Sequence, residues 1–417
     1  MSSSAASVRL HRRLDRSSPV AKEVGKLRGS DFGVEDLAAI THYLHASSSQ
    51  LKQHYRKILK IRNLLDVIAW FEQSEFGNNV LFPPSKSPVF KFVDLFAGIG
   101  GMRLGMQGAG GQCIFSSEWD DSARMTYFAN FGEIPFGDIT QIASEHRFSS
   151  EIPNHDVLVG GFPCQAFSIA GFKGGFADTR GTLFFNLARV LHDHRPRAFL
   201  FENVKGLVSH NRRHTFSRIL DVLRNEPGLR YHVKCKIVNA KDFGVPQNRE
   251  RIFIVGFRNK KDHDRFEFPQ GRETRKRIRS ILETSEVDTK YYLSKQYYDT
   301  LVKHRERHAA KGNGFGFEVK KNDEIANAIV VGGMGRERNL VIDQRRKTFV
   351  PTTNIKSPVN SLGIRRMTPR EWARLQGFDE AFEIPVSDAQ AYKQLGNSVA
   401  VPAIEATAHA IVAALGL

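Results

Sequence analysis

Short apolar runs alternate with amphipathic stretches through the middle of the chain. The runs are FKFVDLF, QCIFSSE, HDVLVG and RAFLFEN, and stretches with helical spacing such as GTLFFNLARVLHDH lie between them. Two further runs, HVKCKIVNA and RIFIVGF, can supply two more strands. Strands that alternate with helices predict an α/β fold with a doubly wound, mostly parallel sheet.

The flanking regions have different patterns. Residues 1–88 are first basic and Ser-rich, and then show helical spacing up to a break at FPPSKSP, where prolines stop helices and central strands. After Phe257 the pattern becomes charged, Gly-rich and irregular up to about Lys356, and a helical tail closes the chain. We therefore expect a helical N-terminal extension over residues 1–88 and a large α/β domain over residues 89–258. A smaller irregular domain follows over residues 259–363, and residues 364–417 form a hinge and a return to the α/β domain.

The charge balance favours a polyanionic partner. The chain has 61 Lys and Arg against 44 Asp and Glu, a formal net charge of +17, and a pI near 9.8. Nucleic acid is the leading candidate, although a merely soluble basic surface has the same composition. We find no span apolar enough to cross a bilayer, and the basic, polar start MSSSAASVRLHRRLDRSS has no signal-peptide core. We expect a soluble, cytoplasmic protein that does not bind membranes.

The three cysteines are too few and too scattered for a disulfide framework or a four-ligand zinc site. They are Cys113, Cys164 and Cys235, and no Cys or His spacing indicates a metal. A reducing compartment is their natural setting. Each cysteine is then either a small core residue or a chemical group.

Residues that follow the first apolar runs could form an adenosine pocket, because ligands bind at the carboxyl ends of strands in open α/β sheets. The first turn, DLFAGIGG, is rich in glycine, but a dinucleotide fingerprint counted from Gly98 would need a glycine where Arg103 stands. Glu118 could accept hydrogen bonds from both ribose hydroxyls, Trp119 could stack on a purine, and Asp138 could accept an adenine amino proton. Each signal alone also occurs by chance in caps and cores.

The stretch GGFPCQAFS places Cys164 directly after an apolar run. A buried cysteine is most often inert, but a thiol near a loop-to-helix junction can have a lowered pKa. Glu202 ends the strand RAFLF, where a carboxylate is costly unless it is paired or used, and QNRER brings Arg249 and Arg251 to the same edge. A thiolate, an acid and a guanidinium are therefore expected to converge.

These groups suit methylation of a pyrimidine at C5. Cys164 would add to C6, Glu202 would donate to N3 and stabilise the exocyclic amine, and Arg251 would hold O2, so that C5 becomes nucleophilic. The C5 proton then leaves and the thiolate is expelled. Because C6 is buried in a duplex, the base must first swing out into the pocket.

The same residues lie in motifs that resemble those of bacterial DNA (cytosine-5) methyltransferases, which use S-adenosylmethionine. The blocks DLFAGIGG, SEWD, GDI, GGFPCQAFS, RGTLFF, ENV, QNRER, RRMTPREWARLQGF and AYKQLGNSVAVP occur in the family's order between Phe90 and Pro402. The resemblance implies a restriction-modification (type II) or orphan enzyme. KGNGFGF is similar to a stretch of methyltransferases of CCWGG sites, a hint about the target.

The resemblance also implies roles for matching positions. Gln165 and Ser168 belong to the mobile loop that closes over DNA, Arg249 acts beside the catalytic residues as a phosphate contact, and no metal is required. Residues 259–363 become the target-recognition domain, where the loop VGGMGRERN offers Arg336 and Arg338 to DNA. The implied S-adenosylmethionine pocket consists of Phe96, Gly98, Ile99, Gly101, Glu118, Trp119, Asp138, Ile139, Leu183, Asn397 and Ser398.

Alternatives remain at three points. The substrate could be tRNA, as in one branch of the family, although that branch is compact where this chain has its long recognition region. The protein could instead be a DNA-binding regulator with vestigial catalytic residues, which intact Cys164, Glu202 and Arg251 disfavour. The N-terminal helices invite a helix-turn-helix reading, but SSS replaces the turn glycine, so a structural or DNA-backbone-supporting role is preferred. We expect a monomer on double-stranded DNA, with a possible cognate restriction endonuclease for the same site.

Overall fold

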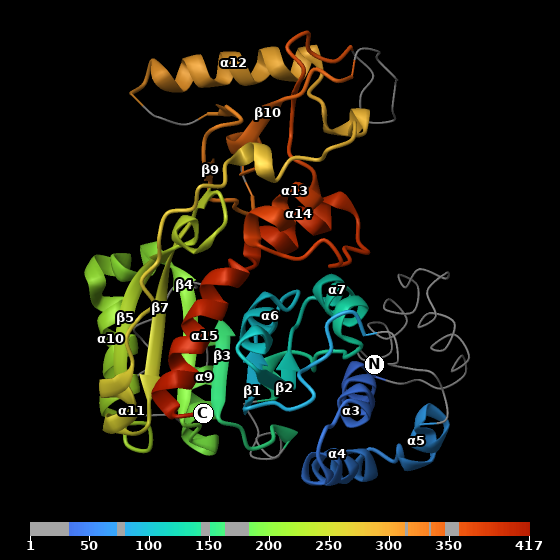
Figure 1. Ribbon diagram of the computed structural model, residues 1–417, viewed down its shortest axis with the longest axis vertical. Coiled ribbons are helices and arrows are strands. Elements are labelled where there is room, and N and C mark those ends of the chain that lie inside the picture. Colours follow the sequence, from blue (N-terminus) through green and yellow to red (C-terminus); the bar gives the residue numbers. More distant parts are fainter. Residues whose placement is uncertain are drawn as a thin grey trace.

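The computed structural model describes residues 33–72, 80–142, 151–162, 183–312, 316–332, 335–346 and 358–417. Its centre is a six-stranded sheet in the order β2-β1-β3-β4-β7-β5 (Figure 1). β7 alone runs antiparallel to the other five strands, so the expected α/β fold with a mostly parallel sheet is confirmed. The strands are β1 (Phe90–Leu95), β2 (Gly111–Ser117), β3 (Val157–Gly161), β4 (Ala198–Val204), β5 (His232–Asn239) and β7 (Glu250–Phe257).

Helices cover both faces of this sheet. On one face α6 (Gly101–Gly108) and α15 (Val401–Leu415) share a core with the strands, and on the other face α9 (Leu183–His194) and α10 (His214–Asn225) do so. The helix α11 (Lys260–Arg265) is followed by Phe266 and Phe268, which join the first of these cores. The α/β body therefore extends past the expected boundary at residue 258.

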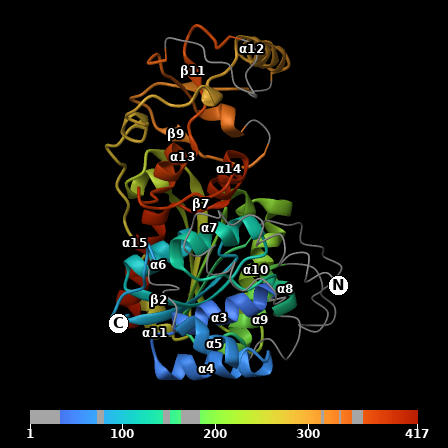
Figure 2. The same cartoon turned by 90° about the vertical axis from the view of Figure 1, so that its right-hand side faces the viewer.

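The N-terminal extension is helical over its described residues and lies along the free edge of the sheet. Its helices α3 (Val34–Leu44) and α4 (Ser49–Ile61) lie beside β2, and α5 (Leu65–Glu72) packs against these two helices (Figure 2). Ser48 caps α4 by accepting a hydrogen bond from the Leu51 amide at 3.2 Å, which explains the serines between the first two helices. Apolar side chains of α3 and α4 belong to the same core as those of β1 and β2, so the extension is not a separate folding unit.

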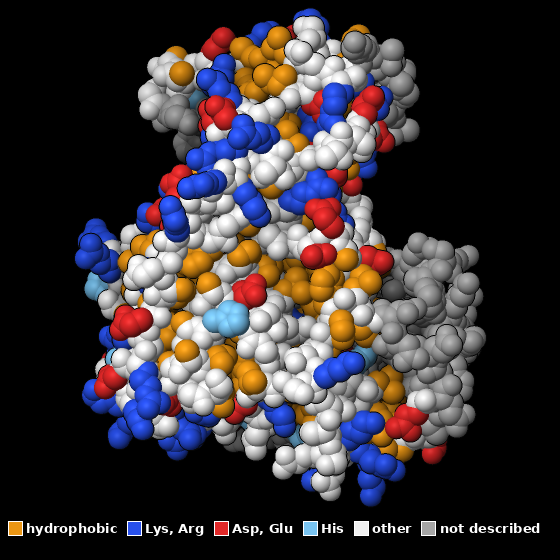
Figure 3. All heavy atoms as spheres, in the orientation of Figure 1, with side chains coloured by type: hydrophobic (Ala, Val, Ile, Leu, Met, Phe, Trp, Pro, Cys, Tyr) orange, Lys and Arg blue, Asp and Glu red, His pale blue; other side chains and the backbone are white. Residues whose placement is uncertain are grey.

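The segment after Phe268 forms most of a second, narrower body above the sheet, with its own small core of Leu293, Leu301, Phe317, Leu340 and Ile364 (Figures 1 and 3). It contains a three-stranded sheet of β8 (Val319–Lys320), β10 (Leu340–Ile342) and β11 (Ile364–Arg365). It also contains α12 (Lys295–Ala309), a regular helix that the charged, irregular sequence pattern did not predict. Only Leu301 of α12 is buried, which explains the weak apolar signal.

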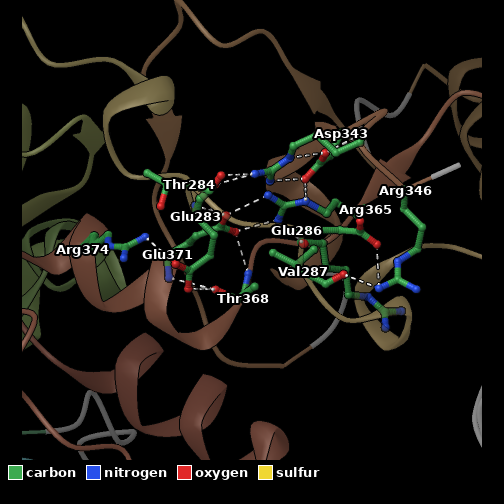
Figure 4. A network of polar contacts seen from close by, with 12 residues as sticks. Glu283, Thr284, Glu286, Val287, Asp343, Arg346, Arg365, Thr368, Glu371 and Arg374 are labelled. Atoms are coloured by element: carbon green, nitrogen blue, oxygen red, sulfur yellow. Dashed lines mark hydrogen bonds and ion pairs between the residues drawn. The ribbon is translucent and has the colours of Figure 1, made fainter.

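Two helices, α13 (Pro369–Gln376) and α14 (Asp388–Asn397), connect the upper body to the α/β body. Arg365 is fully buried, and its terminal nitrogens donate to the two carboxylate oxygens of Glu371 in α13, both at 2.8 Å (Figure 4). Its Nε donates to Asp343, which follows β10, at 2.9 Å. A satisfied buried ion network of this kind fixes the orientation of the strands relative to α13.

Shorter elements complete the described chain. They are α7 (Asp121–Phe131), α8 (Ile139–Ile142), β6 (Gln247–Asn248), β9 (Ala326–Asn327), η4 (Lys205–Val208), η5 (His210–Arg213), η6 (Ala240–Phe243), η7 (Ile278–Ser280), η8 (Thr289–Tyr291) and η9 (Gly335–Asn339). The pair β6 and β9 is parallel and joins the α/β body to the upper body.

One described stretch is long and apolar enough to cross a membrane, contrary to the expectation from the sequence. It runs from Asp388 to Leu415 with a mean hydropathy of 1.6, and 56% of its most apolar window is buried inside the protein. The stretch comprises α14 and α15, separated by a break at Ser398, and α15 packs against α6. It is therefore accounted for as the core helices of the fold.

Candidate active site

A cavity of about 650 Å³ lies at the carboxyl ends of β1 to β4. Its lining includes every residue of the expected cofactor pocket, together with the expected acid and both arginines. Lys393, which sequence reasoning missed, also lines it and donates to Asp120 at 2.6 Å. The expected residues in the lining are Phe96, Gly98, Ile99, Gly101, Glu118, Trp119, Asp138, Ile139, Leu183, Glu202, Arg249, Arg251, Asn397 and Ser398.

The turn after β1 has an unusual backbone. Phe96, Gly98 and Gly100 all adopt positive φ angles, of 58°, 56° and 87°. Positive φ is costly for a side chain such as that of Phe96, and such strain often occurs at functional sites. At Gly100 even a methyl group is excluded, because a Cβ would lie 2.2 Å from the Phe131 ring.

The departure from the dinucleotide fingerprint has a structural reason. Arg103, which stands where that fingerprint has its last glycine, is fully buried behind the turn. Its Nη1 and Nη2 donate to Glu133 at 2.6 and 3.0 Å, and its guanidinium lies 4.4 Å from the centre of the Phe131 ring. Arg103 therefore holds α6 against the protein interior.

Glu118 joins the turns that follow β1 and β2. It is buried, and its carboxylate oxygens accept hydrogen bonds from the amides of Gly98 and Asp120, both at 2.8 Å. Burial raises its pKa, and the two amides oppose this change. Trp119 beside it is 71% exposed, so its ring is accessible from the cavity. A fixed carboxylate, an open indole and the Asp138 carboxylate suit a ribose and a purine, and thus fit an adenosine-containing cofactor.

Buried Glu202 and partly buried Arg251 form an ion pair at the other end of the cavity. The Arg251 Nε lies 3.0 Å from Glu202 Oε1, and the pair bridges the neighbouring strands β4 and β7. Burial raises the pKa of Glu202, and the charges of Arg251 and Arg249 oppose the rise. A carboxyl group of this kind can hold a proton and donate it to a ligand.

The strand that leads toward the expected nucleophile ends beside this pair. Gly161 of β3 is the strand partner of Glu202, and the Asn203 amide donates to the Phe162 carbonyl at 2.8 Å. Cys164, Gln165 and Ser168 themselves lie outside the described residues. Burial raises the pKa of Cys113 to about 12 and that of Cys235 to about 11, so both thiols stay protonated at neutral pH.

Arg249 does not have the geometry expected of a phosphate contact. It is only 3% exposed, and its terminal nitrogens donate to the carbonyls of Ile329 at 2.7 Å, Gly396 at 3.1 Å and Ser398 at 2.6 Å. Burial lowers its pKa to about 9, and Arg251 contributes to this change. Arg249 thus connects the cavity, the upper body and the end of α14, which spacing in the sequence could not indicate.

Arg336 and Arg338 lie in η9, outside the cavity lining, and both are exposed. The Arg336 guanidinium lies 5.5 Å from the centre of the Tyr392 ring on α14. Glu337 between them is buried and accepts a hydrogen bond from Arg366 at 2.9 Å. The buried glutamate therefore orients Arg366.

A mostly parallel α/β sheet with an adenosine-type pocket and a buried acid at its strand ends defines the class of α/β methyltransferases. Within this class, the chain belongs to the family of C-5 cytosine-specific DNA methylases, whose model matches residues 90–413. The resemblance seen in the sequence is thereby confirmed, and the chain is an enzyme of the DNA (cytosine-5-)-methyltransferase type.

Relatives and solved structures agree with this assignment. The chain is 59% identical to the type II methyltransferase M.HpaII of Haemophilus parainfluenzae over 81% of this chain and 94% of the relative. It is 46% identical to the type II methyltransferase M.SsoII of Shigella sonnei, over 82% and 85% of the two chains. The fold is similar to that of the S. pombe Dnmt2 methyltransferase, with a TM-score of 0.57 and 19% identity over 79% and 99% of the chains. In the described ranges, no three His, Cys, Asp or Glu residues are arranged to hold a metal ion.

Proposed function

We propose that the protein methylates C5 of a flipped-out cytosine within a specific short sequence of duplex DNA, through a covalent bond between Cys164 and C6. The observation that carries the proposal is the pair of Glu202 and Arg251, 3.0 Å apart, in the same cavity as Glu118 and beside the strand that leads to Cys164. This arrangement supports an acid, an O2 donor and a nucleophile around one base.

Glu202 would act as the acid. Its raised pKa favours the protonated carboxyl, which can donate a proton to N3 of cytosine as the ring accepts the nucleophile. Arg251 contributes its Nε to the pair with Glu202 and its Nη1 to the Glu250 carbonyl at 2.9 Å, so Nη2 would donate to O2. Held between them, the base is activated and oriented at the same time.

Cys164 would act as the nucleophile. Its thiolate forms a bond to C6 as the C5–C6 double bond breaks, and the electrons move through C4 to N3, which Glu202 protonates. The resulting enamine has its double bond between C4 and C5, and its C5 attacks the methyl group. Loss of the C5 proton to solvent and return of the N3 proton to Glu202 accompany expulsion of the thiolate. The net change at the base is a methyl group in place of one proton.

S-adenosylmethionine, when bound, would supply the methyl group. Glu118 would bind its ribose, Trp119 would stack on the adenine, and Asp138 would accept from the adenine amino group. The glycine turn after β1 allows close approach to the backbone, and Asn397 with Ser398 would close the pocket from the end of α14. Ile139 and Leu183 would supply apolar surface.

DNA would bind between the two bodies, with residues 259–363 reading the sequence and Gln165 and Ser168 closing over the base. The formal charge of +17 supports a DNA partner, and Lys and Arg side chains gather over the upper body and the neck in Figure 3. We propose that the protein acts as a monomer in the cytoplasm and that its biological partner is a cognate endonuclease. The proposed domain limits are those expected from the sequence, except that the α/β body extends to Phe268. Methyl transfer to duplex DNA but not to tRNA would support this proposal, and the reverse result would support the tRNA alternative.

The test uses Cys164→Ser. A hydroxyl is a much poorer nucleophile at neutral pH, so the variant should bind S-adenosylmethionine and lose methyl transfer. Duplex DNA with 5-fluorocytosine at the target should trap the wild-type protein covalently, because fluorine cannot leave C5 as a proton does. Trapping of the variant to the same extent would contradict the role of Cys164.

A further inference from the structure

The N-terminal helices contact the part of the sheet from which the proposed cofactor pocket is built. The family match begins at residue 90, so α3 and α4 precede the matched residues. Both helices stand along β2, which among the described strands has a strand partner on one side only, β1 (Figure 2). The carboxyl end of β2 leads directly to Glu118 and Trp119.

Three buried side chains of the helices bond main-chain groups along this edge. The Tyr55 hydroxyl donates to the Ile114 carbonyl, and the Thr41 hydroxyl accepts from the Ile134 amide at 3.0 Å. The third side chain is that of His42, whose Nε2 accepts from the Ser116 amide at 3.3 Å. All three side chains are almost completely buried, so water cannot replace these bonds if they are lost.

The ring of His42 has a fixed role because both of its nitrogens are engaged. Nδ1 donates to the Ala38 carbonyl at 2.9 Å, which leaves Nε2 as the acceptor for Ser116. Burial lowers the pKa of His42 to about 4, with the Glu133 carboxylate opposing the change, so the ring is neutral at physiological pH. The side chain therefore keeps its acceptor throughout the range in which the enzyme works.

The bonded amides belong to the two backbone segments that carry the expected adenosine contacts. The segment after Ile134 runs beside β2: the Phe136 amide donates to the Ser116 carbonyl and the Glu118 amide to the Phe136 carbonyl, both at 2.8 Å. The Ser117 hydroxyl donates to the Gly137 carbonyl at 2.7 Å, immediately before Asp138. The two segments thus form one hydrogen-bonded unit, in which Glu118 follows β2 and Asp138 follows the segment beside it.

We infer that α3 and α4 are positioning elements of the cofactor pocket, and that Thr41, His42 and Tyr55 set the separation of Glu118 and Asp138. The inference rests on the proposed function of the pocket. Thr41 fixes the start of the segment that ends in Asp138, while His42 and Tyr55 fix the strand that ends in Glu118. A ribose and an adenine bound between them require both contacts at once, so cofactor affinity depends on the helices although they line no part of the cavity.

The test compares Thr41→Val and Tyr55→Phe with matched controls. Each variant removes one hydroxyl and keeps the shape of the side chain. Thr41→Ser keeps the acceptor, and Tyr43→Phe removes a hydroxyl that bonds Glu72 inside the extension at 2.9 Å. Cofactor affinity is measured by calorimetry with S-adenosylmethionine on the full-length protein without DNA, and KM and kcat are measured for methyl transfer to duplex DNA.

We expect Thr41→Val and Tyr55→Phe to raise the Kd and the KM for S-adenosylmethionine by about threefold to tenfold each, as for the loss of one buried hydrogen bond. The kcat at saturating cofactor should stay near that of the wild type, and the two control variants should match the wild type in Kd. Lower melting temperatures with unchanged Kd and KM would overturn the inference and leave a purely structural extension. If Tyr55→Phe does not fold, the comparison of Thr41→Val with Thr41→Ser tests the inference by itself. Failure of the wild-type protein to bind S-adenosylmethionine would instead overturn the proposed function.

Discussion

Burial sets the chemistry of single ionisable residues around the pocket, and Asp94 is the extreme case. Asp94 lies in β1, behind the glycine turn, with no exposed surface. Burial raises its pKa to about 8, with Arg103 lowering and Glu118 raising it further. At neutral pH the folded protein therefore holds this carboxyl largely protonated.

Replacement of Asp94 by Asn should make stability less dependent on pH. Between the usual carboxyl pKa of 3.8 and about 8, the folded chain keeps a proton that the unfolded chain releases. The free energy of unfolding of the wild type should therefore fall as pH rises through this window, by at most about 1.4 kcal/mol per pH unit from this residue. Asn has the same shape and no titrating proton, so the stability of Asp94→Asn relative to the wild type should increase with pH. Urea denaturation from pH 5 to pH 9 measures both slopes, and parallel slopes would contradict the prediction.

At the scale of elements, the packing of α6 depends on one buried ion pair. Arg103 of α6 and Glu133 after α7 are both buried and share two hydrogen bonds. Burial alone would raise the pKa of Glu133, but Arg103 reverses this and holds it below its usual range. The helix that follows the glycine turn is thus bound to Glu133, whose carboxylate in turn lies 3.8 Å from Nε2 of His42 in the extension.

Arg103→Met should destabilise the protein by about 3–5 kcal/mol, because it leaves the Glu133 carboxylate buried without its partner. The double variant Arg103→Met/Glu133→Gln should lose less than the single variant, since the uncompensated charge is gone. Arg189→Met serves as the control: Arg189 pairs with Asp193 within α9 at 2.8 Å on the surface, and its loss should cost less than about 1 kcal/mol. Urea denaturation measures all three, and a double variant no more stable than Arg103→Met would refute this account.

The elements that could be predicted from the sequence are those with a strong local pattern. The six strands of the main sheet follow apolar runs, and the pocket residues could be located because the ends of adjacent parallel strands meet at one edge. The pattern failed for α12, because a helix with one buried residue has little amphipathic signal. It also failed for Arg249 and for the three residues Thr41, His42 and Tyr55. The hydrogen-bond partners of these side chains are main-chain carbonyls and amides of residues far away in the sequence. Because almost every residue has both groups, the sequence does not show which residue will be the partner.

At the scale of the whole molecule, two bodies share a short junction. Arg249 bonds Ile329 of the upper body and Ser398 at the pocket, and Arg365 bonds Glu371 of α13 (Figure 4). Both arginines are buried, and an apolar core that joins Phe131 of the α/β body to Ile329 of the upper body and Trp372 of α13 fills the junction around them. The orientation of the upper body is thereby coupled to the residues that line the cavity.

Arg338→Ala should relax the choice of target sequence. Arg338 is exposed on the upper body, and arginine is well shaped to bind guanine through O6 and N7, so its loss should cost about 1–3 kcal/mol at one base position. The Arg336 guanidinium packs against the Tyr392 ring of α14, so we expect it to contact phosphate and not a base. Arg336→Ala should therefore weaken binding to all DNA sequences equally and reduce the salt dependence of binding. Methylome sequencing of cells that express each variant should show new near-cognate sites only for Arg338→Ala. An unchanged motif with a uniform loss of rate would mean that Arg338 contacts phosphate.

The two outer strands of the main sheet differ in how they are protected, and this bears on self-association. An open strand edge invites a second chain to add its own strand, which leads to aggregation. The helices α3 and α4 cover β2, whereas β5 is protected by lysines: Lys234 and Lys236 donate to the carbonyls of Phe266 and Pro269 in the segment that follows α11. A chain shortened to the family match would keep the second protection and lose the first. The extension thus protects the enzyme against aggregation, in addition to its place in the fold.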